Sequence, residues 1–238
     1  MSAVSVRTLA GPELAAALDD LAALRIAVFA AFPYLYDGDP AYERRYLADY
    51  AADEDAVLVA AFDGPHIIGA ATAAPMRHQT PAFRAPFAAA GLDPARLFYF
   101  GESVLLPAYR GRGIGHAFFD AREAQARACG AEATCFAAVI RPGDHPARPA
   151  DHWPLDSFWR RRGYAPVEGL VVPLAWKEHG EREESDKPMQ VYAFGSTPAA
   201  YPRADEARDE GRGAPLSSCS ARRSSAIDPD DIVALPAP

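Results

Sequence analysis

The sequence predicts an α+β domain in which helices flank a central, twisted, mixed sheet, giving α/β/α layers. Segments with apolar residues at helical spacing, such as residues 11–32, alternate with short apolar runs that are typical of strands. The run LFYFGESVLL at 97–106 is apolar on both faces, as expected for a strand in the middle of a sheet. Hydrophobic residues make up 50% and charged residues 24% of the 238 residues, which is a globular composition.

The order of the elements follows from apolar periodicity and from the Gly and Pro residues that interrupt it. Pro12 falls in the first turn of the first helix, where its missing N–H costs little. Residues 78–96, rich in Pro and Ala, are expected to be irregular. The expected elements are a strand at 4–10, helices at 11–32 and 41–52, two strands within 56–76 joined by a turn at Asp63-Gly64-Pro65, a strand at 97–106, a helix from the glycine-rich turn to Gly130, a strand at 131–140, a helix at 154–163 and strands at 170–176 and 189–194.

The chain is expected to form one domain over residues 1–194, followed by a disordered tail over 195–238. The tail is rich in Pro, Ser, Ala and charged residues and shows no sustained apolar period. It therefore buries too little apolar surface to offset the entropy of ordering the chain.

Composition and charge exclude several classes of function. A net charge of −8 argues against nucleic acid as the main partner, since phosphate backbones recruit basic surfaces. No apolar run is long enough to span a bilayer, and the N-terminus lacks the pattern of a signal peptide. The three cysteines, Cys129, Cys135 and Cys219, form no CxxC pair and no metal-ligand spacing. We therefore expect a cytoplasmic protein with no membrane partner and no metal.

The stretch YRGRGIGHAFFDARE at 109–123 places Gly111, Gly113 and Gly115 between a buried strand and an amphipathic helix. Free backbone N–H groups and the helix dipole both favour an anion at such a turn, so the pattern predicts a phosphate-binding loop. The third glycine comes one residue too early for the GxGxxG turn of dinucleotide-binding enzymes, and the chain has no Walker loop. The alternative is a tight strand-to-helix turn that binds nothing.

This stretch resembles the pyrophosphate loop of the GCN5-related N-acetyltransferase (GNAT) superfamily, whose pattern is Arg or Gln, two residues, Gly, one residue, and Gly or Ala. Arg110, Gly113 and Gly115 fill that pattern. The preceding SVLLPAYRG at 103–111 resembles the family's fourth strand and its turn, and FWRRRGYAPV at 158–167 resembles its later helix-turn-strand. The expected order of elements agrees with the family from about residue 4 to 194.

The resemblance implies that the loop binds the pyrophosphate of acetyl-CoA. Its N–H groups would face the phosphate oxygens, and Arg110 or Arg112 would add charge. In the family the fourth strand splits from the fifth, and its exposed backbone pairs with the pantetheine arm and polarises the thioester carbonyl. The implied cofactor-binding residues are Ser103, Val104, Leu105, Arg110, Gly111, Arg112, Gly113, Ile114, Gly115 and His116.

The chain departs from the family at the residue that usually protonates the departing thiolate. Trp159 stands where many members carry a tyrosine, and an indole N–H is not a useful acid. Phe158 and Trp159 are therefore expected to pack against the cofactor or the core, and Tyr164 matches a position that is usually a core phenylalanine. A thiol pKa of about 8.5 makes the thiolate a tolerable leaving group without a dedicated acid.

In this superfamily the segment between the first two helices, here FPYLYDGD, commonly contributes to the acceptor pocket. The alternative is a loop whose aromatic side chains cover the sheet edge, since such side chains bury readily either way. The segment RPGDHPARPADHWP at 141–154 contains His145 and His152 without a convincing ligand spacing, so we expect a polar loop on the substrate side. The implied acceptor-binding residues are Phe32, Tyr34 and Tyr36.

Glu102 is the expected catalytic residue. Strand alternation places it on one face with Phe98, Phe100 and Val104, where a carboxylate is costly to bury without a partner or a cleft. Partial desolvation would raise its pKa, which suits a general base that takes the proton of an incoming ammonium directly or through water. The alternative is a structural ion pair with an arginine of the chain.

Together these features predict an acetyl-CoA-dependent N-acetyltransferase that transfers the acetyl group to a primary amine of a small molecule by direct attack in a ternary complex. The alternative is a non-catalytic acyl-CoA-binding or regulatory module. A homodimer is compatible with either interpretation.

Overall fold

The computed structural model describes residues 4–194 of the 238-residue chain, and the tail expected at 195–238 lies outside the described residues. Seven strands form one sheet in the order β1-β2-β3-β4-β5-β7-β6. The strands are β1 (Val4–Leu9), β2 (Val57–Asp63), β3 (His66–Pro75), β4 (Leu97–Leu105), β5 (Ala133–Val139), β6 (Tyr164–Trp176) and β7 (Ser185–Phe194), and the helices are α1 (Gly11–Phe29), α2 (Pro40–Ala52), α3 (Pro81–Ala89), α4 (Ile114–Ala128) and α5 (Asp156–Arg161).

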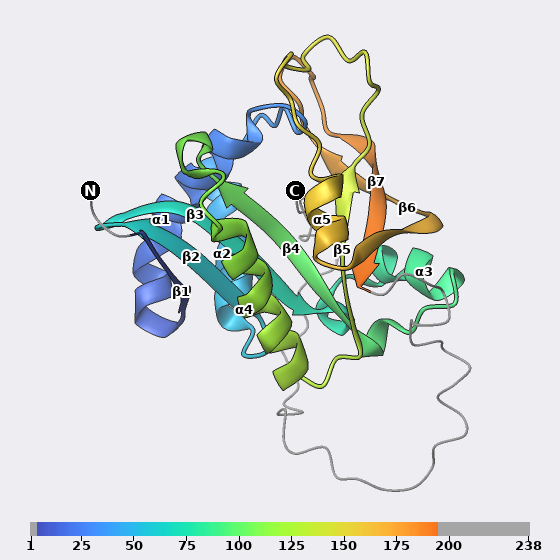
Figure 1. The fold of residues 1–238 in the computed structure, drawn as a ribbon, viewed down its shortest axis with the longest axis horizontal. Coiled ribbons are helices and arrows are strands. Elements are labelled where there is room, and N and C mark those ends of the chain that lie inside the picture. Colours follow the sequence, from blue (N-terminus) through green and yellow to red (C-terminus); the bar gives the residue numbers. More distant parts are fainter. Residues whose placement is uncertain (1–3, 195–238) are drawn as a thin grey trace, which may run out of the picture.

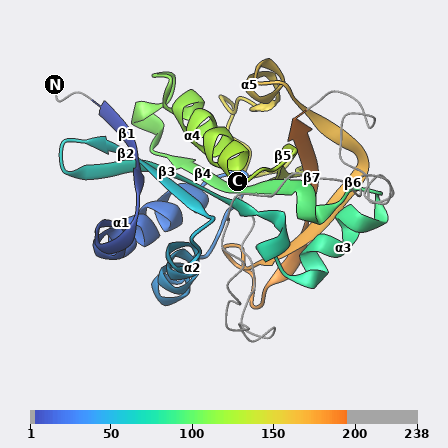
Figure 2. The ribbon, with the colours of Figure 1, turned by 90° about the horizontal axis from the view of Figure 1, so that it is seen from below.

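The sheet is mixed and twisted, as predicted. Every neighbouring pair of strands is antiparallel except β4 and β5, which are parallel and are connected through α4 (Figure 1). Figure 2 shows α4 and α5 on one side of the sheet and α1, α2 and α3 on the other. The α/β/α layering expected from the sequence is therefore confirmed.

Each face of the sheet has its own apolar core. The core on the α1 side includes Leu21, Leu47 and Phe87 from the three helices there. The core on the α4 side includes Phe118 and Phe119. Fully burying one such side chain stabilises the fold by about 1.5–3 kcal/mol, so the two cores together hold the helices onto the sheet. Within residues 4–194, no helix combines the length and apolar character needed to cross a bilayer.

Two local expectations are corrected by the structure. The segment 78–96 is not irregular, because it contains α3, whose first turn is capped by the Thr80 hydroxyl accepting from the Phe83 N–H at 3.2 Å. Pro81 opens this helix, where a missing N–H is tolerated, and only Pro86 interrupts it. The first helix ends at Phe29 instead of residue 32, because the following residues turn toward β6 and β7.

Candidate functional site

β4 and β5 pair over a short distance and then separate. The parallel ladder joins only Leu97–Tyr99 to Ala133–Cys135. Beyond it, β4 continues to pair with β3, while β5 pairs with β7. Figure 1 shows the two strands diverging toward their C-terminal ends. We call the unpaired side of residues 100–105 of β4 the β4–β5 opening; Ser103, Val104 and Leu105 lie along it, as the resemblance implied.

A bulge in β4 reverses the strand's alternation at the start of the opening. Ala73 pairs with Phe100 and Ala71 with Ser103, so three steps on β4 oppose two on β3. A Cβ on Gly101 would lie 2.5 Å from both the Thr72 Oγ1 and the Tyr50 hydroxyl, so only glycine fits the bulge. The single face expected for Phe98, Phe100, Glu102 and Val104 is therefore wrong: Phe100 belongs to the α4-side core and Val104 to the α1-side core.

Glu102 lies on the α1 side and is 1% exposed. Its carboxylate is ion-paired with Arg25 of α1, which also pairs with Glu43 of α2. All three side chains are buried, and we call them the ionic cluster. A carboxylate held in this way has a guanidinium to balance its charge and is out of contact with solvent. The geometry therefore supports the structural ion pair, the alternative to a general base that the sequence left open.

A second buried arginine holds the other side of the bulge. Arg122 of α4 is 2% exposed, and its Nη1 donates to the Glu102 carbonyl oxygen at 3.0 Å. Its guanidinium carbon lies 4.4 Å from the ring centre of Phe100. Burial lowers the pKa of Arg122 to about 10, which leaves it charged at neutral pH. The backbone leading into the opening is thus fixed from both faces of the sheet.

The glycine loop (residues 110–115) joins β4 to α4 and exposes a row of backbone donors. Gly111 and Gly113 adopt φ values of +76° and +81°, which favour glycine, and a Cβ on either would meet no atom within 4 Å. Among residues 4–194, the N–H groups of residues 111–115 have no hydrogen-bond acceptor; the first helical bond runs from the His116 N–H to the Gly113 carbonyl at 3.0 Å. Such a row of free N–H groups at a helix start suits an anion.

The remaining predicted residues of the loop contribute in different ways. Arg110 and Arg112 are exposed, and Arg112 Nη2 donates to the Ala108 carbonyl at 3.0 Å. Ile114 is 4% exposed and belongs to the core, so only its backbone faces the loop. The His116 ring packs edge-on against Phe158 of α5, with 4.9 Å between ring centres. The Phe158 ring lies 3.4 Å from where a Cβ on Gly115 would stand, which is an ordinary van der Waals contact.

The aromatic residues of α5 and β6 are structural, as expected. Trp159 packs against Phe136 and Tyr192, with ring centres 5.1 and 4.8 Å apart. Tyr164 is 1% exposed, and its hydroxyl lies 2.7 Å from the Thr134 hydroxyl and donates to Glu123 at 3.2 Å. Burial raises the pKa of Tyr164 above its usual value. Its proton is therefore not available at neutral pH.

The three predicted acceptor-binding residues separate into two kinds. Tyr34 and Tyr36 are 7% and 6% exposed and belong to the core. The Tyr34 ring packs 5.8 Å from that of Trp176, while burial and the nearby Glu43 carboxylate raise the pKa of Tyr36. Phe32 is only half-buried. The two tyrosines therefore fit the alternative weighed above, in which the aromatic side chains cover the sheet edge. Of the three residues, only Phe32 is still exposed enough to contact an acceptor.

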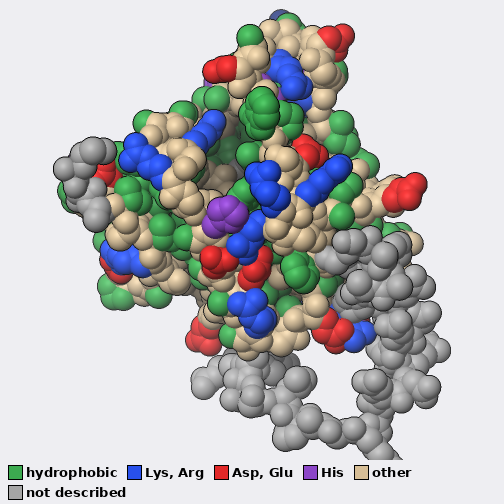
Figure 3. Space-filling model, in the orientation of Figure 1, with side chains coloured by type: hydrophobic (Ala, Val, Ile, Leu, Met, Phe, Trp, Pro, Cys, Tyr) green, Lys and Arg blue, Asp and Glu red, His purple; other side chains and the backbone are tan. Residues whose placement is uncertain are grey.

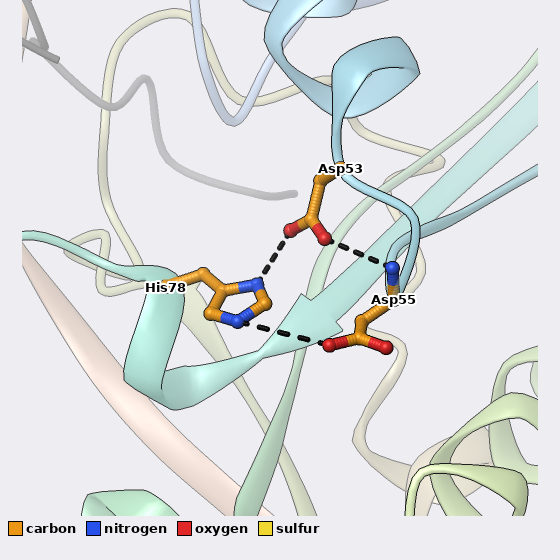
Figure 4. A group of neighbouring side chains, drawn as sticks. All are labelled: Asp53, Asp55 and His78. Carbon is orange, nitrogen blue, oxygen red and sulfur yellow. Dashed lines mark hydrogen bonds and ion pairs between the residues drawn. The ribbon is translucent and has the colours of Figure 1, made fainter. Parts of the chain in front are cut away.

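Asp53, Asp55 and His78 form a group of possible metal ligands near the end of α2 (Figure 4). His78 Nδ1 lies 2.6 Å from an Asp53 oxygen, and the other Asp53 oxygen accepts from the Asp55 N–H at 3.0 Å. Arg77 pairs with Asp55 at 2.7 Å. The carboxylates already have cationic or N–H partners, so we assign no metal here, and the absence of a metal stays a prediction.

The chain belongs to the acetyltransferase (GNAT) family, whose model matches residues 22–150, more than half of the chain. The fold is that of solved members. A GCN5-related N-acetyltransferase from Kribbella flavida has a TM-score of 0.51 and 17% identity, with 82% of this chain and 98% of that chain covered. A ribosomal-protein-alanine N-acetyltransferase from Brucella melitensis has a TM-score of 0.52 and 14% identity, with 81% and 99% covered.

A third similar structure is yncA from Salmonella typhimurium, described as an acetyltransferase and determined with acetyl-CoA. It has a TM-score of 0.54 and 13% identity, with 85% of this chain and 99% of that chain covered. At these identities the likeness extends to the fold. A search of curated protein sequences finds no match.

Proposed function

We propose that this acetyltransferase uses acetyl-CoA to acetylate a primary amine of a small molecule, by direct transfer in a ternary complex. The observation that carries the proposal is the continuity of two features. The β4–β5 opening leads along Ser103–Leu105, whose edge toward β5 has no strand partner, directly into the glycine loop with its unpaired N–H groups. An extended backbone edge that ends in an anion site matches a thioester arm that ends in a pyrophosphate.

Each part of acetyl-CoA has a group to receive it. The N–H groups of residues 111–115 would bind the pyrophosphate oxygens, with charge from Arg110 and Arg112. The amide groups of the pantetheine arm would continue the sheet along β4. An N–H of Ser103–Leu105 would then donate to the thioester carbonyl, where negative charge develops during attack. Hydrogen bonds of this kind are worth about 1.5–3 kcal/mol each when the partner is charged.

The thiols of the described residues favour direct transfer over a mechanism with a covalent acetyl-enzyme. Cys135 is 1% exposed, and burial raises its pKa above the usual range for a thiol. It therefore provides no thiolate at neutral pH. Cys129 lies at the end of α4 remote from the glycine loop. The amine itself is then the nucleophile, and proximity within the ternary complex supplies much of the rate.

The surroundings of Trp159 and Glu102 favour a second function. Trp159 packs in the core where many family members carry an acidic tyrosine, and Glu102 is paired with Arg25. A chain without these two groups could bind acyl-CoA as a non-catalytic regulatory module.

One experiment separates the two functions. The purified protein is mixed with acetyl-CoA and a panel of primary amines, including aminoglycosides, polyamines and amino acids, and free thiol is measured over time. We expect thiol release that depends on both protein and amine, with the acetylated amine detected by mass spectrometry. Tight acetyl-CoA binding by calorimetry without turnover on any amine would instead identify a binding module.

A further inference from the structure

The segment 140–155, between β5 and α5, begins where β5 ends, on one side of the β4–β5 opening. Its first residues are held by two other loops: Arg141 Nε donates to the carbonyl of Pro33, between α1 and α2, at 2.7 Å, and Arg141 is ion-paired with Glu178, between β6 and β7. Figure 1 shows this segment rising beyond the ends of both strands before it returns to α5. In the same orientation, Figure 3 shows a hollow in the surface in this region, with Lys and Arg side chains around it.

His152 lies near the end of this segment and contacts a residue outside it. Its ring packs edge-on against Phe32, with 4.8 Å between ring centres. Arg110 of the glycine loop acts on the same imidazole through its positive charge, which lowers the pKa of His152. The imidazole is therefore in contact with a residue of the expected acceptor side and coupled by charge to a residue of the expected pyrophosphate side. It is partly exposed, unlike the buried Glu102.

The proposed reaction needs a proton acceptor in this region. A primary amine has a pKa near 10, so at neutral pH it arrives as an ammonium without a free electron pair. Glu102 is buried, paired with Arg25 and directed away from solvent. His145, the other histidine beside Phe32, already accepts the Ala147 N–H on its Nδ1 at 3.2 Å. Of these three groups, His152 is left as a partly exposed titratable side chain beside Phe32.

The charges around His152 suit a base. Burial, Arg148 of its own segment and Arg110 of the glycine loop lower its pKa, and Asp151 acts in the opposite direction. The element packed against its ring contributes Phe32, which carries no charge. The imidazole is therefore neutral at pH 7 and able to accept a proton. Pyrophosphate bound at Arg110 would cancel part of the lowering and make His152 more basic when acetyl-CoA is present.

We propose that His152 accepts the proton of the acceptor ammonium, an inference that rests on the proposed function. The freed amine nitrogen attacks the thioester carbon, the C–N bond forms, and the C–S bond breaks with its electron pair leaving on the thiolate. The second proton lost by nitrogen passes to the thiolate, giving the CoA thiol. The proton on His152 returns to solvent, so that one proton is released in each turnover.

The central test compares His152→Gln with His66→Gln, a control at an exposed residue at the start of β3. We expect His152→Gln to lower kcat by about 10²-fold, the usual scale for losing a general base. The acidic limb of its pH–rate profile should disappear, and its Kd for acetyl-CoA should stay near the wild-type value. His66→Gln should match the wild type in all three measurements.

Acceptor basicity provides a second readout that a structural role would not move. An amine of low pKa, such as a hydroxylamine, is already unprotonated at pH 7, so it should lose much less activity in His152→Gln than an alkylamine does. Equal losses with both acceptors, or a wild-type kcat and pH profile, would overturn the assignment of His152.

The assignment can also be checked by binding alone. Histidine NMR titration should show one imidazole with a lowered pKa that rises when CoA is added and is missing in His152→Gln. No effect of CoA on that imidazole would contradict the coupling through Arg110. If wild-type protein binds acetyl-CoA but acetylates nothing, the proposed function fails first and the catalytic role of His152 fails with it. An active wild type with a fully active His152→Gln rejects His152 alone.

Discussion

The glycine loop and the ionic cluster both lie close to the C-terminal half of β4, yet they satisfy their polar groups in opposite ways. In the loop, the N–H groups of residues 111–115 have no acceptor among residues 4–194, and the loop is mostly exposed. In the cluster, Arg25, Glu43 and Glu102 pair with one another and are buried. The N–H groups of the loop are therefore open to solvent and to a ligand, whereas the cluster has no solvent contact through which to receive one. Exposure, and not polarity, therefore distinguishes polar groups that are accessible to a ligand from polar groups that hold the fold together.

The largest effect is expected from breaking the ionic cluster. Arg25→Met leaves two buried carboxylates without a cation, which should cost about 3–5 kcal/mol of the free energy of unfolding. Glu102→Gln keeps the Arg25–Glu43 pair and should cost less, about 1–3 kcal/mol. Urea denaturation of both variants measures the two values.

A reversed order of these two losses would show that the cluster is not held by charge balance. Acetyl-CoA binding to the folded Glu102→Gln protein serves as the control and should be near that of the wild type. A fully stable Glu102→Gln enzyme with a kcat lowered 10²-fold would restore the general-base hypothesis for Glu102.

The next largest effect is expected on acetyl-CoA binding by the glycine loop. It is tested by comparing two glycines at opposite ends of α4. Gly113 and Gly130 have φ values of +81° and +69°, and a Cβ on either meets nothing within 4 Å. Valine should therefore strain both positions by about 1–2 kcal/mol. Only Gly113→Val should also block a ligand: losing two hydrogen bonds of ~1.5 kcal/mol each weakens acetyl-CoA binding roughly 10²-fold.

Calorimetric Kd values for acetyl-CoA decide this comparison. The Gly130 N–H donates to the Arg127 carbonyl at 3.1 Å, so that end of the helix is already satisfied and Gly130→Val should keep its affinity. Equal weakening in both variants would mean that strain, and not contact with the pyrophosphate, explains the effect.

The smallest effect is expected for the Asp53–His78 pair, which is partly exposed and so differs from both the exposed glycine loop and the buried ionic cluster. Burial alone would raise the pKa of Asp53, but its hydrogen bond and charge interaction with His78, with two backbone N–H groups, lower it. A lowered folded-state pKa stabilises the protein above the unfolded value near 3.9, and this contribution is lost as pH falls through the folded value. For a pair near the surface we expect at most about 1 kcal/mol.

Asp53→Asn should remove that pH dependence and little else. Thermal unfolding from pH 7 down to pH 3 should show a smaller decrease in Tm for Asp53→Asn than for the wild type. Parallel curves for the two proteins would show that Asp53 does not contribute to acid destabilisation.

The sequence was sufficient where the signal is local. The glycine spacing at 111–115 requires a particular backbone within a few residues, so the loop and the helix that follows it could be located without a structure. The order of most elements followed from periodicity in the same way, and the mixed sheet is what the family resemblance implied. Helix α3 was missed because two of its nine residues, Pro81 and Pro86, suggested irregular structure, although Thr80 at its N-cap was a usable signal.

The roles of Glu102 and His152 depended on contacts between residues far apart in the chain. Alternation assigned Glu102 to the wrong face because a bulge at Gly101 shifts the register, and that bulge is fixed by Thr72 and Tyr50 from other elements. Arg25, its partner, had no mark in the sequence to distinguish it from other arginines. His152 carried only a weak signal, two histidines in one segment, until folding placed Phe32 against it and coupled it by charge to Arg110.

The sequence by itself determined the fold class, the family pattern and the loop with free N–H groups, because periodicity and glycine conformation act over a few neighbouring residues. Only the tertiary structure decided which charged side chains are buried in pairs and which stay open to a ligand. The physical reason is that desolvation and ion pairing depend on what lies within a few ångströms in space. For Glu102 those neighbours come from α1, α2 and α4, and no local pattern in the chain specifies them.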